Sequence, residues 1–246
     1  MPPDSVTSST GGRGRPLKRM FDAVPSRYDS MNRILTLGLD ERWRRRAVTR
    51  LLKDNPSRVL DLCCGTGDLA LHVARRASEN TEIVGLDFSD TMLEVAVKKS
   101  CAAPWGTRVS FTEGDASKMR FEDESFDAVG IAYGFRNLTW RNPLKDQAIA
   151  EVLRVLRPGG RFVIIETSQP KNALWRSLSH AYHRAVTGPI GGLLSGNRSA
   201  YAYLAKSASE FYTPDEIIEM LNDAGFSSVK VEPQLGGVAA IHTAVK

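Results

Sequence analysis

Three acidic side chains stand at the ends of apolar runs of strand type, and the first of these runs leads into a glycine turn. Residues 58–62 form an apolar run, residues 65–67 are Gly-Thr-Gly, and residues 69–74 have apolar side chains at helical spacing. This pattern predicts the strand, turn and helix that begin a doubly wound α/β domain. A ligand is expected at the carboxyl end of the strand, where glycines let it approach the backbone.

The acids around the turn indicate which ligand it would hold. A pyrophosphate favours the uncovered positive end of a helix, whereas Asp61 and Asp68 place negative charge beside this turn. The sulfonium and ammonium groups of S-adenosylmethionine are cationic and suit such carboxylates. Because Gly65, Gly67 and Ala70 also satisfy the loose dinucleotide pattern, an NAD-dependent oxidoreductase remains an alternative at this point.

Two further predicted strands end in acids at the same edge of the sheet. Residues 82–87 end at Asp87, 20 residues beyond Gly67, where a carboxylate can accept both hydroxyls of a ribose. The strand predicted over residues 108–116 ends in Gly-Asp-Ala, and its Asp115 can accept from an adenine amino group. Met92 can lie against the adenine face. Both acids can instead cap the helix or turn that follows them, and Met92 can be an ordinary core residue.

The remaining strands set the fold class. Residues 125–134 and 161–166 are apolar runs of the buried parallel kind, and residues 228–232 and 238–245 are joined by a connection short enough to force them antiparallel. The sequence therefore predicts an α/β fold with a doubly wound, seven-stranded, Rossmann-like sheet and an antiparallel C-terminal hairpin.

The chain is expected to form one domain over residues 18–246, after a disordered tail at 1–17. An N-terminal helical extension over residues 18–55 and a helical lid insertion over residues 171–212 complete the predicted organisation.

No apolar run approaches membrane-spanning length, and three cysteines do not form a disulfide framework. These features predict a cytoplasmic protein. Because no second Cys pair or nearby His accompanies Cys63 and Cys64, no metal is expected.

Positive charge gathers on the N-terminal extension. Residues 13–58 contain 13 Lys or Arg and 5 Asp or Glu, a net charge of +8. Within this stretch Leu39, Trp43, Ala47 and Leu51 recur every four residues and predict an amphipathic helix with Asp40 as its N-cap. Its other faces carry Arg42, Arg44, Arg45, Arg46 and Arg50, which are either solvated or contact an anionic membrane surface or nucleic acid.

Several segments in order, from about Met20 to the C-terminus, resemble the ubiquinone/menaquinone biosynthesis C-methyltransferase family. They are Tyr28-Asp29-x-Met31-Asn32 with Trp43, Gly134-Phe135-Arg136-Asn137, residues 154–160 through Glu166, and residues 197–204 with Ser207. The resemblance implies S-adenosylmethionine as methyl donor, no metal, and methylation at a ring carbon of a reduced, prenylated quinone. Asp40 and Thr36 stand where the family usually has His and Ser, so a substrate role for that His does not carry over.

The strand ends and the resemblance together define the expected site. Arg136 and Asn137 are the expected catalytic residues, with Arg136 stabilising a developing oxyanion. The substrate pocket is expected to include Tyr28, Asn32, Tyr133 and Tyr201. The expected donor-binding residues are Asp61, Gly65, Thr66, Gly67, Asp87, Phe88, Met92, Asp115, Ala116 and Ala132, of which Ala132 replaces a serine common in the family.

Other functions remain alternatives at this stage. They are a methyltransferase acting on another small hydrophobic molecule or on RNA, an NAD-dependent oxidoreductase, and a donor-binding regulator without catalysis. RNA is disfavoured because residues 132–136, Ala-Tyr-Gly-Phe-Arg, differ from the Asn-Pro-Pro-Tyr type segment of enzymes that methylate nucleic-acid amines. The expected partners are therefore a prenylated hydroquinone and a membrane surface contacted peripherally, with a homodimer left open and nucleic acid not expected.

Overall fold

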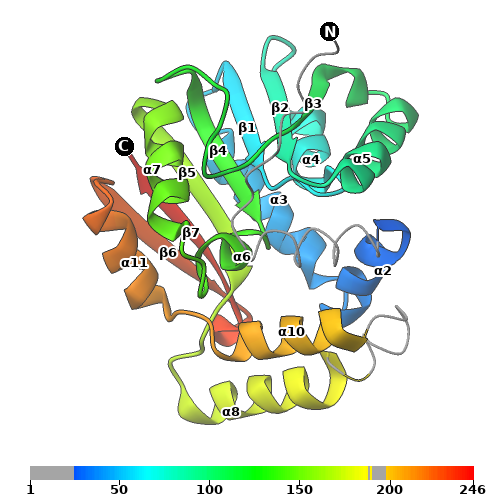
Figure 1. The fold of residues 1–246 in the computed structure, drawn as a ribbon, viewed down its shortest axis with the longest axis vertical. Helices are drawn as coiled ribbons and strands as arrows, with labels where there is room; N and C mark the ends of the chain where they lie inside the picture. Colours follow the sequence, from blue (N-terminus) through cyan, green and yellow to red (C-terminus); the bar gives the residue numbers. More distant parts are fainter. Residues whose placement is uncertain (1–24, 188, 190–197) are drawn as a thin grey trace, which may run out of the picture.

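The computed structural model describes residues 25–187, 189 and 198–246, and the side chains of residues 25–28, 31 and 198–201 lie outside the described part. Seven strands form one sheet in the order β3-β2-β1-β4-β5-β7-β6 (Figure 1). Five strands run parallel: β1 (Arg58–Leu62), β2 (Glu82–Asp87), β3 (Val109–Glu113), β4 (Phe126–Ala132) and β5 (Leu156–Thr167). β7 (Ala239–Val245) is antiparallel to both β5 and β6 (Ser228–Gln234), so the predicted fold class is confirmed.

Helices cover both faces of the sheet. The longer helices are α2 (Pro25–Leu35), α3 (Leu39–Leu51), α4 (Asp68–Arg76), α5 (Asp90–Ala102), α7 (Lys145–Val155), α8 (Ala173–Tyr182), α10 (Arg198–Ser209) and α11 (Pro214–Asp223). Shorter turns are η1 (Gly106–Arg108), α6 (Phe135–Thr139), η2 (His183–Thr187) and η3 (Leu235–Gly237). α3 and α4 pack into one core cluster, whereas α7 and α11 pack into the other.

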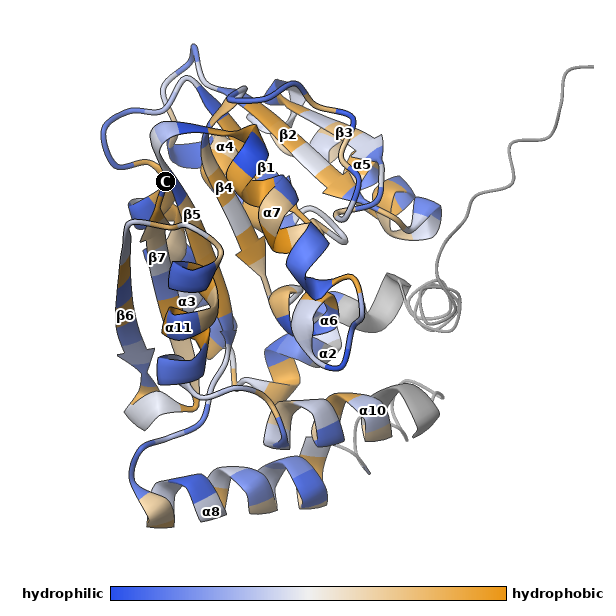
Figure 2. Cartoon of the chain, turned by 60° about the vertical axis from the view of Figure 1, so that its left-hand side comes forward, coloured by the Kyte–Doolittle hydropathy of each residue, from blue (hydrophilic) through white to orange (hydrophobic). Residues whose placement is uncertain are grey.

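Alternation along the strands explains the two clusters. Val59, Ala128 and Val163 point to the side of α3 and α4. Their neighbours Leu60, Val129 and Phe162 point to the side of α7 and α11, and all six are buried. Because both faces are covered, the central strands are apolar almost throughout, as their colouring in Figure 2 shows.

The helices α11 and α3 begin in different ways. Thr213 and Glu216 form a capping box at the start of α11. α3, however, begins at Leu39 after Gly38, whose φ of 75° provides the turn, so the prediction of Asp40 as N-cap is wrong. Asp40 is instead buried inside the helix, where it accepts a hydrogen bond from Thr36 Oγ1 at 2.9 Å.

Several arginines of α3 are buried or paired with other side chains, although the sequence predicts them on a solvated or membrane-facing surface. Arg44 is 4% exposed, with Asp40, Glu41 and Asp68 within 3.7 Å of its guanidinium, so its expected place on a solvated or membrane-facing surface is wrong. Burial of a guanidinium requires such partners, and α3 and α4 supply them. Arg46 bonds to Gln234, and Arg50 pairs with Glu232, which leaves Arg42 and Arg45 as exposed arginines without a side-chain acid among the described residues.

The segment expected to form a lid follows β5. α8 and α10 lie stacked beyond the end of the sheet from which α6 starts (Figure 1). Gln169 Nε2 donates to the carbonyl of Ala208 on α10, and the rings of Trp140 and Tyr203 meet edge to face at 5.9 Å. Its role as a lid stays a prediction, and the tail at 1–17 lies outside the described residues. Among the described helices, none has the length and apolar character needed to cross a membrane.

Candidate active site

The chain leaves β1 and β4, which are neighbours in the sheet, toward opposite faces. α4 follows β1 on one side, and α6 with α7 follows β4 on the other. Such a switch point opens a crevice at the carboxyl ends of the strands, where α/β folds bind their ligands. All the expected donor-binding residues come from the ends of β1 to β4 or from the turns and helix starts that follow.

The glycine turn after β1 needs both of its glycines, for different reasons. Gly65 and Gly67 have φ values of 53° and 80°, in the left-handed region that disfavours other residues. A Cβ on Gly67 would also lie 2.9 Å from the ring of Phe111. A Cβ on Gly65 would meet no atom within 4 Å, which places open space on this side of the turn.

Asp87 holds the glycine turn in place. Its Oδ2 accepts from the backbone N–H of Gly65 at 2.8 Å, and its Oδ1 accepts from that of Ser89 at 3.0 Å. The carboxylate is 5% exposed at the end of β2. It therefore connects the first turn to the start of α5, and its expected role toward a ribose stays a prediction.

Asp61 is a buried acid with one unused oxygen. Oδ2 accepts from the backbone N–H of Ala70 at 2.8 Å, whereas Oδ1 is buried and has no hydrogen-bond partner among the described residues. Burial raises the pKa of Asp61 to about 8, against the smaller opposing effects of the Ala70 hydrogen bond and Arg44. At neutral pH this carboxyl is mostly protonated in the free protein, whereas the sequence led us to expect a negatively charged Asp61.

A second acid at the turn is charged and already paired. Asp68, at the start of α4, forms an ion pair with Lys99, and Arg44 lies 3.7 Å from its Oδ2. Burial raises the pKa of Asp68, but Arg44 and Lys99 outweigh burial and hold that pKa below its usual value. Its negative charge is thus balanced within the protein.

Hydrogen bonds also connect the glycine turn to α2. Thr66 Oγ1 donates to Asp29 Oδ1 at 2.6 Å, and Lys99 Nζ donates to Asp29 Oδ2 at 2.9 Å. Asp29 belongs to one of the motifs quoted above but was not among the expected site residues. Its place in the sequence gives no sign that it reaches the glycine turn, because that contact depends on how α2 lies against α5.

The other expected donor residues lie around this turn. Met92 is buried in the first turn of α5, and Phe88 is half-buried just before that helix. Ala132 ends β4 and is half-buried, whereas Ala116 is buried after β3. Asp115 Oδ1 accepts from the backbone N–H and the hydroxyl of Ser117, at 2.8 and 2.7 Å, so it caps a turn in the free protein.

Arg136 is held by a buried carboxylate. Glu166, which has no exposed surface, accepts from Arg136 Nη1 at 3.1 Å and from its backbone N–H at 3.0 Å. Nη1 also donates to Thr167 Oγ1 at 2.6 Å. Nε is buried without a partner, and Nη2 makes no hydrogen bond among the described residues, so three of the guanidinium's five N–H donors are unused.

Unpartnered polar atoms gather at this end of the sheet. Asn137, next to Arg136 on α6, has a buried Oδ1 with no partner, and the hydroxyl of Ser168 after β5 has none either. Buried polar atoms without partners cost free energy, so these atoms are available to bond a ligand or water. Similar atoms also occur away from this edge, on Arg58, Arg108, His242 and Thr243.

The expected substrate residues are only partly described. Tyr133, with a φ of 60°, packs its ring 5.9 Å from the guanidinium of Arg44, on the side of α3. Asn32 is half-buried on α2, and its carbonyl accepts from the Thr36 hydroxyl at 2.8 Å. The side chains of Tyr28 and Tyr201 lie outside the described residues.

His183, on η2, lies close enough to Arg136 for the charge of that guanidinium to act on its imidazole. Burial lowers the pKa of His183 to about 4, and the positive charge of Arg136 lowers it further in the same direction, as does His180. Its Nδ1 lies 3.2 Å from Thr187 Oγ1, and no hydrogen bond of its Nε2 is found among the described residues. Nothing in the sequence indicates that His183 and Arg136, 47 residues apart, come near each other.

Metal ligands are not a feature of the part of the chain that the structure describes. There, no group of three or more His, Cys, Asp or Glu side chains could hold a metal ion. Burial raises the pKa of Cys63 and Cys64 well above its usual value, so neither thiol is a ready ligand.

Known proteins resemble this chain over nearly its whole length. Residues 9–246 match the model of the ubiE/COQ5 methyltransferase family. A demethylmenaquinone methyltransferase of Thermus thermophilus is 45% identical over 91% of this chain and 98% of the relative. A ubiquinone/menaquinone biosynthesis C-methyltransferase UbiE of Geotalea daltonii is 38% identical over 95% of this chain and 97% of the relative.

A solved structure agrees on the fold. A SAM dependent methyltransferase from Aquifex aeolicus superposes with a TM-score of 0.55, covering 96% of this chain and 99% of its own, at 17% identity. At this identity the likeness concerns the fold alone. Together with the family match over residues 9–246, it establishes that this chain belongs to the ubiE/COQ5 methyltransferase family.

Proposed function

We propose that the protein transfers a methyl group from S-adenosylmethionine to a ring carbon of a reduced, prenylated quinone, with demethylmenaquinol as the first substrate to test. The observation that carries the proposal is the buried Arg136 guanidinium, held by Glu166 at the switch point with donors left over. The relatives that are 45% and 42% identical, both named demethylmenaquinone methyltransferase, favour the naphthoquinone ring.

The donor site fits a cationic methyl donor. Asp61 Oδ1 is an unused buried acceptor beside the glycine turn, and the open space at Gly65 leaves room for a ligand close to the backbone. Asp61 would accept from the donor's ammonium group, while Asp87 and Asp115 would face its ribose and adenine. When bound, S-adenosylmethionine supplies an electrophilic methyl group on a sulfonium.

The residues around Arg136 would help to activate the hydroquinone ring as a nucleophile. A hydroquinone carbon becomes a good nucleophile when a ring hydroxyl loses its proton, and a phenol titrates near 10 in water. Arg136 would stabilise the phenolate, and Asn137 would help to orient the ring. The proton leaves the hydroxyl, the carbon bonds to the methyl group as the carbon–sulfur bond breaks, and the ring proton then leaves to restore aromaticity.

His183 is the proton acceptor in this proposal. It is neutral at physiological pH, its only hydrogen bond among the described residues is made by Nδ1, and the charge of Arg136 acts on it. The positive charge of Arg136 makes the imidazolium unfavourable until the phenolate forms between the two groups. The anion then stabilises both cations, so proton transfer and charge compensation occur together.

The direct test uses purified protein, labelled S-adenosylmethionine and a panel of reduced demethylquinones with naphthoquinone or benzoquinone rings. We expect label to appear on the ring carbon of the naphthoquinol, as identified by mass spectrometry. Donor alone should raise the melting temperature by mass action, whereas NAD should not. Donor binding without methylation of any quinol in the panel would contradict the proposed substrate class.

Donor binding should release a proton from Asp61. In the free protein the pKa of Asp61 is raised to about 8, so this carboxyl is protonated at pH 7, and the donor's ammonium group would lower that pKa. Calorimetry at pH 7 in buffers of different ionisation enthalpy should therefore report release of about one proton. Asp61→Asn should abolish the release and weaken binding. Asp68→Asn is the matched control that should keep the release, because Asp68 is already charged.

Removing Arg136 should affect the chemical step. We expect Arg136→Ala to lower the single-turnover methylation rate by about 100- to 1,000-fold while donor affinity stays near normal. Arg120→Ala, which removes an exposed arginine, should leave both unchanged. A normal rate in Arg136→Ala would exclude a role for this guanidinium in stabilising the phenolate.

Replacing His183 should remove a proton acceptor while keeping a polar side chain. We expect His183→Gln to lower the rate by about 100-fold or more, whereas His180→Gln, in which His180 bonds to Gln169, should have a much smaller effect. The wild-type rate should fall as pH drops through about 4, because protonated His183 cannot accept. If His183→Gln retains both the rate and this acid limb, another group is the acceptor.

A further inference from the structure

Exposed apolar side chains gather on one side of the molecule. The described residues include seven large apolar side chains that are exposed, and six of them lie on α8 or on the segments at its two ends. The seventh, Val97, lies on α5. We call the group the α8 surface; its members are Ile34, Leu37, Leu174, Trp175, Leu178 and Leu235.

α8 does not bury its apolar residues as a surface helix usually does. No residue of α8 is buried, and residues 173–178 are all exposed. Leu174 and Leu178, which are 72% and 51% exposed, are four residues apart and so share a face of the helix. A helix in a globular protein normally turns such a stripe toward the core, whereas the described residues leave this one uncovered.

Two hydrogen bonds connect α8 to the segments at its ends. Trp175 Nε1 donates to the carbonyl of Leu235 at 3.0 Å, which joins the start of α8 to η3. Tyr182 Oη donates to the carbonyl of Leu35 at 2.9 Å, which joins its other end to the end of α2. The apolar residues thus belong to one connected surface built from three distant parts of the sequence.

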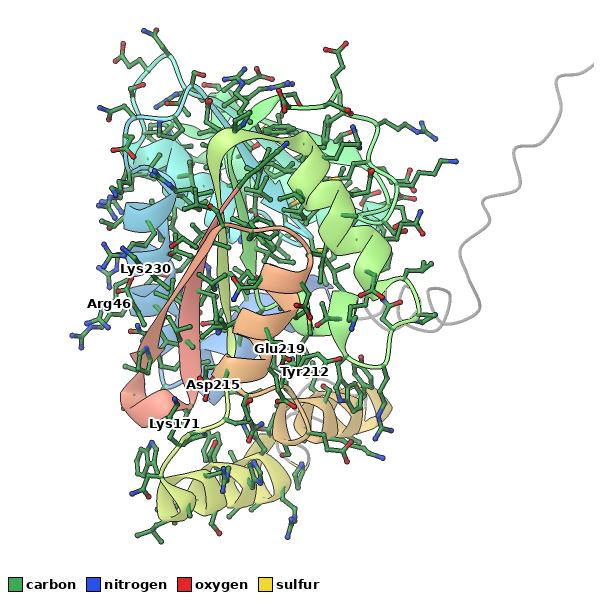
Figure 3. All side chains as sticks on the ribbon, turned by 90° about the vertical axis from the view of Figure 1, so that its left-hand side faces the viewer. Arg46, Lys171, Tyr212, Asp215, Glu219 and Lys230 are labelled. Atoms are coloured by element: carbon green, nitrogen blue, oxygen red, sulfur yellow. The ribbon has the colours of Figure 1, made fainter. Side chains whose placement is uncertain are left out.

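The charge of this region has one sign. Residues 167–209 contain five Lys or Arg and no Asp or Glu. Arg176 and Arg184 are exposed on α8 and η2, and neither forms an ion pair with the described residues. Lys171 is the exception, because it pairs at 3.2 Å with Asp215 of α11; both are labelled in Figure 3.

We propose that the α8 surface docks on an anionic lipid bilayer. Its apolar side chains would enter the boundary between headgroups and acyl chains, and Arg176 and Arg184 would contact the headgroups. An exposed helix with leucines and a tryptophan, flanked by arginines and without acids, has the composition of an interfacial helix. The purpose of this docking rests on the proposed function, since the tail of a prenylated quinol remains in the bilayer.

The charge pattern favours a membrane over a protein partner. A second copy of the chain would bring the same positive region against itself, and like charges at an interface oppose association. An anionic bilayer complements the region and adds attraction that salt screens. The arginines of α3 are less suited to contact a membrane, because Arg44 is buried and Arg46 and Arg50 already have partners.

The test uses the full chain with vesicles that contain neither quinone nor methyl donor, so it does not depend on the proposed reaction. Phosphatidylglycerol-containing and purely phosphatidylcholine vesicles are compared by co-sedimentation at low and high salt. We expect preferential binding to the anionic vesicles and partial loss at high salt. The double variant Leu174→Gln, Leu178→Gln should bind about tenfold more weakly, because two apolar side chains no longer enter the bilayer. Arg176→Gln should weaken binding at low salt and have less effect at high salt.

The matched control is Val97→Gln, which changes an apolar residue that is 45% exposed on a different helix and should bind like the wild type. Thermal melts establish that each variant is folded. Unchanged vesicle binding by the double variant would overturn the proposal, as would equal loss in Val97→Gln. A dimer in sedimentation analysis that only the double variant abolishes would also overturn it and identify the surface as an interface between copies.

Discussion

The structure depends most on a carboxylate that has no contact with water. Glu166 is wholly buried at the end of β5, so its charge must be compensated inside the protein. Arg136 and the backbone N–H of Thr167 compensate this charge through hydrogen bonds to the carboxylate. These bonds fix where α6 begins, how the loop after β5 departs and which part of the guanidinium remains available. Removing either partner would leave a buried charge, which explains why Arg136 is held rigidly while part of its guanidinium remains available.

Charge compensation also organises the donor side of the crevice. Arg44, Asp68, Lys99 and Asp29 neutralise one another across α3, α4, α5 and α2. Asp61 lies beside this network, but burial keeps it mostly uncharged in the free protein. The turn therefore presents one acid that is already paired and one that a cation can ionise. This difference between two carboxylates seven residues apart distinguishes the site from one that receives a phosphate.

Local patterns in the sequence predicted most of the fold and the glycine turn after β1. Strand alternation, the Gly65-Thr66-Gly67 turn and the Thr213 cap depend on neighbours in the chain, so they are visible without a structure. Asp40 was misplaced as an N-cap because Gly38 makes the turn, and Arg44 was expected on the surface because its partner Asp68 lies on another helix. His183 and Asp29 were missed for the same reason, since their contacts form only when distant helices pack together.

α8 contributes to the molecule without being part of its core. Since none of its residues is buried, most substitutions along its exposed face change the free energy of unfolding by no more than about 0.5 kcal/mol. Selection for a stable fold therefore places little restraint on this helix. Substitutions there can therefore change what the helix contacts while the fold stays intact, because Glu166 and the central strands lie elsewhere.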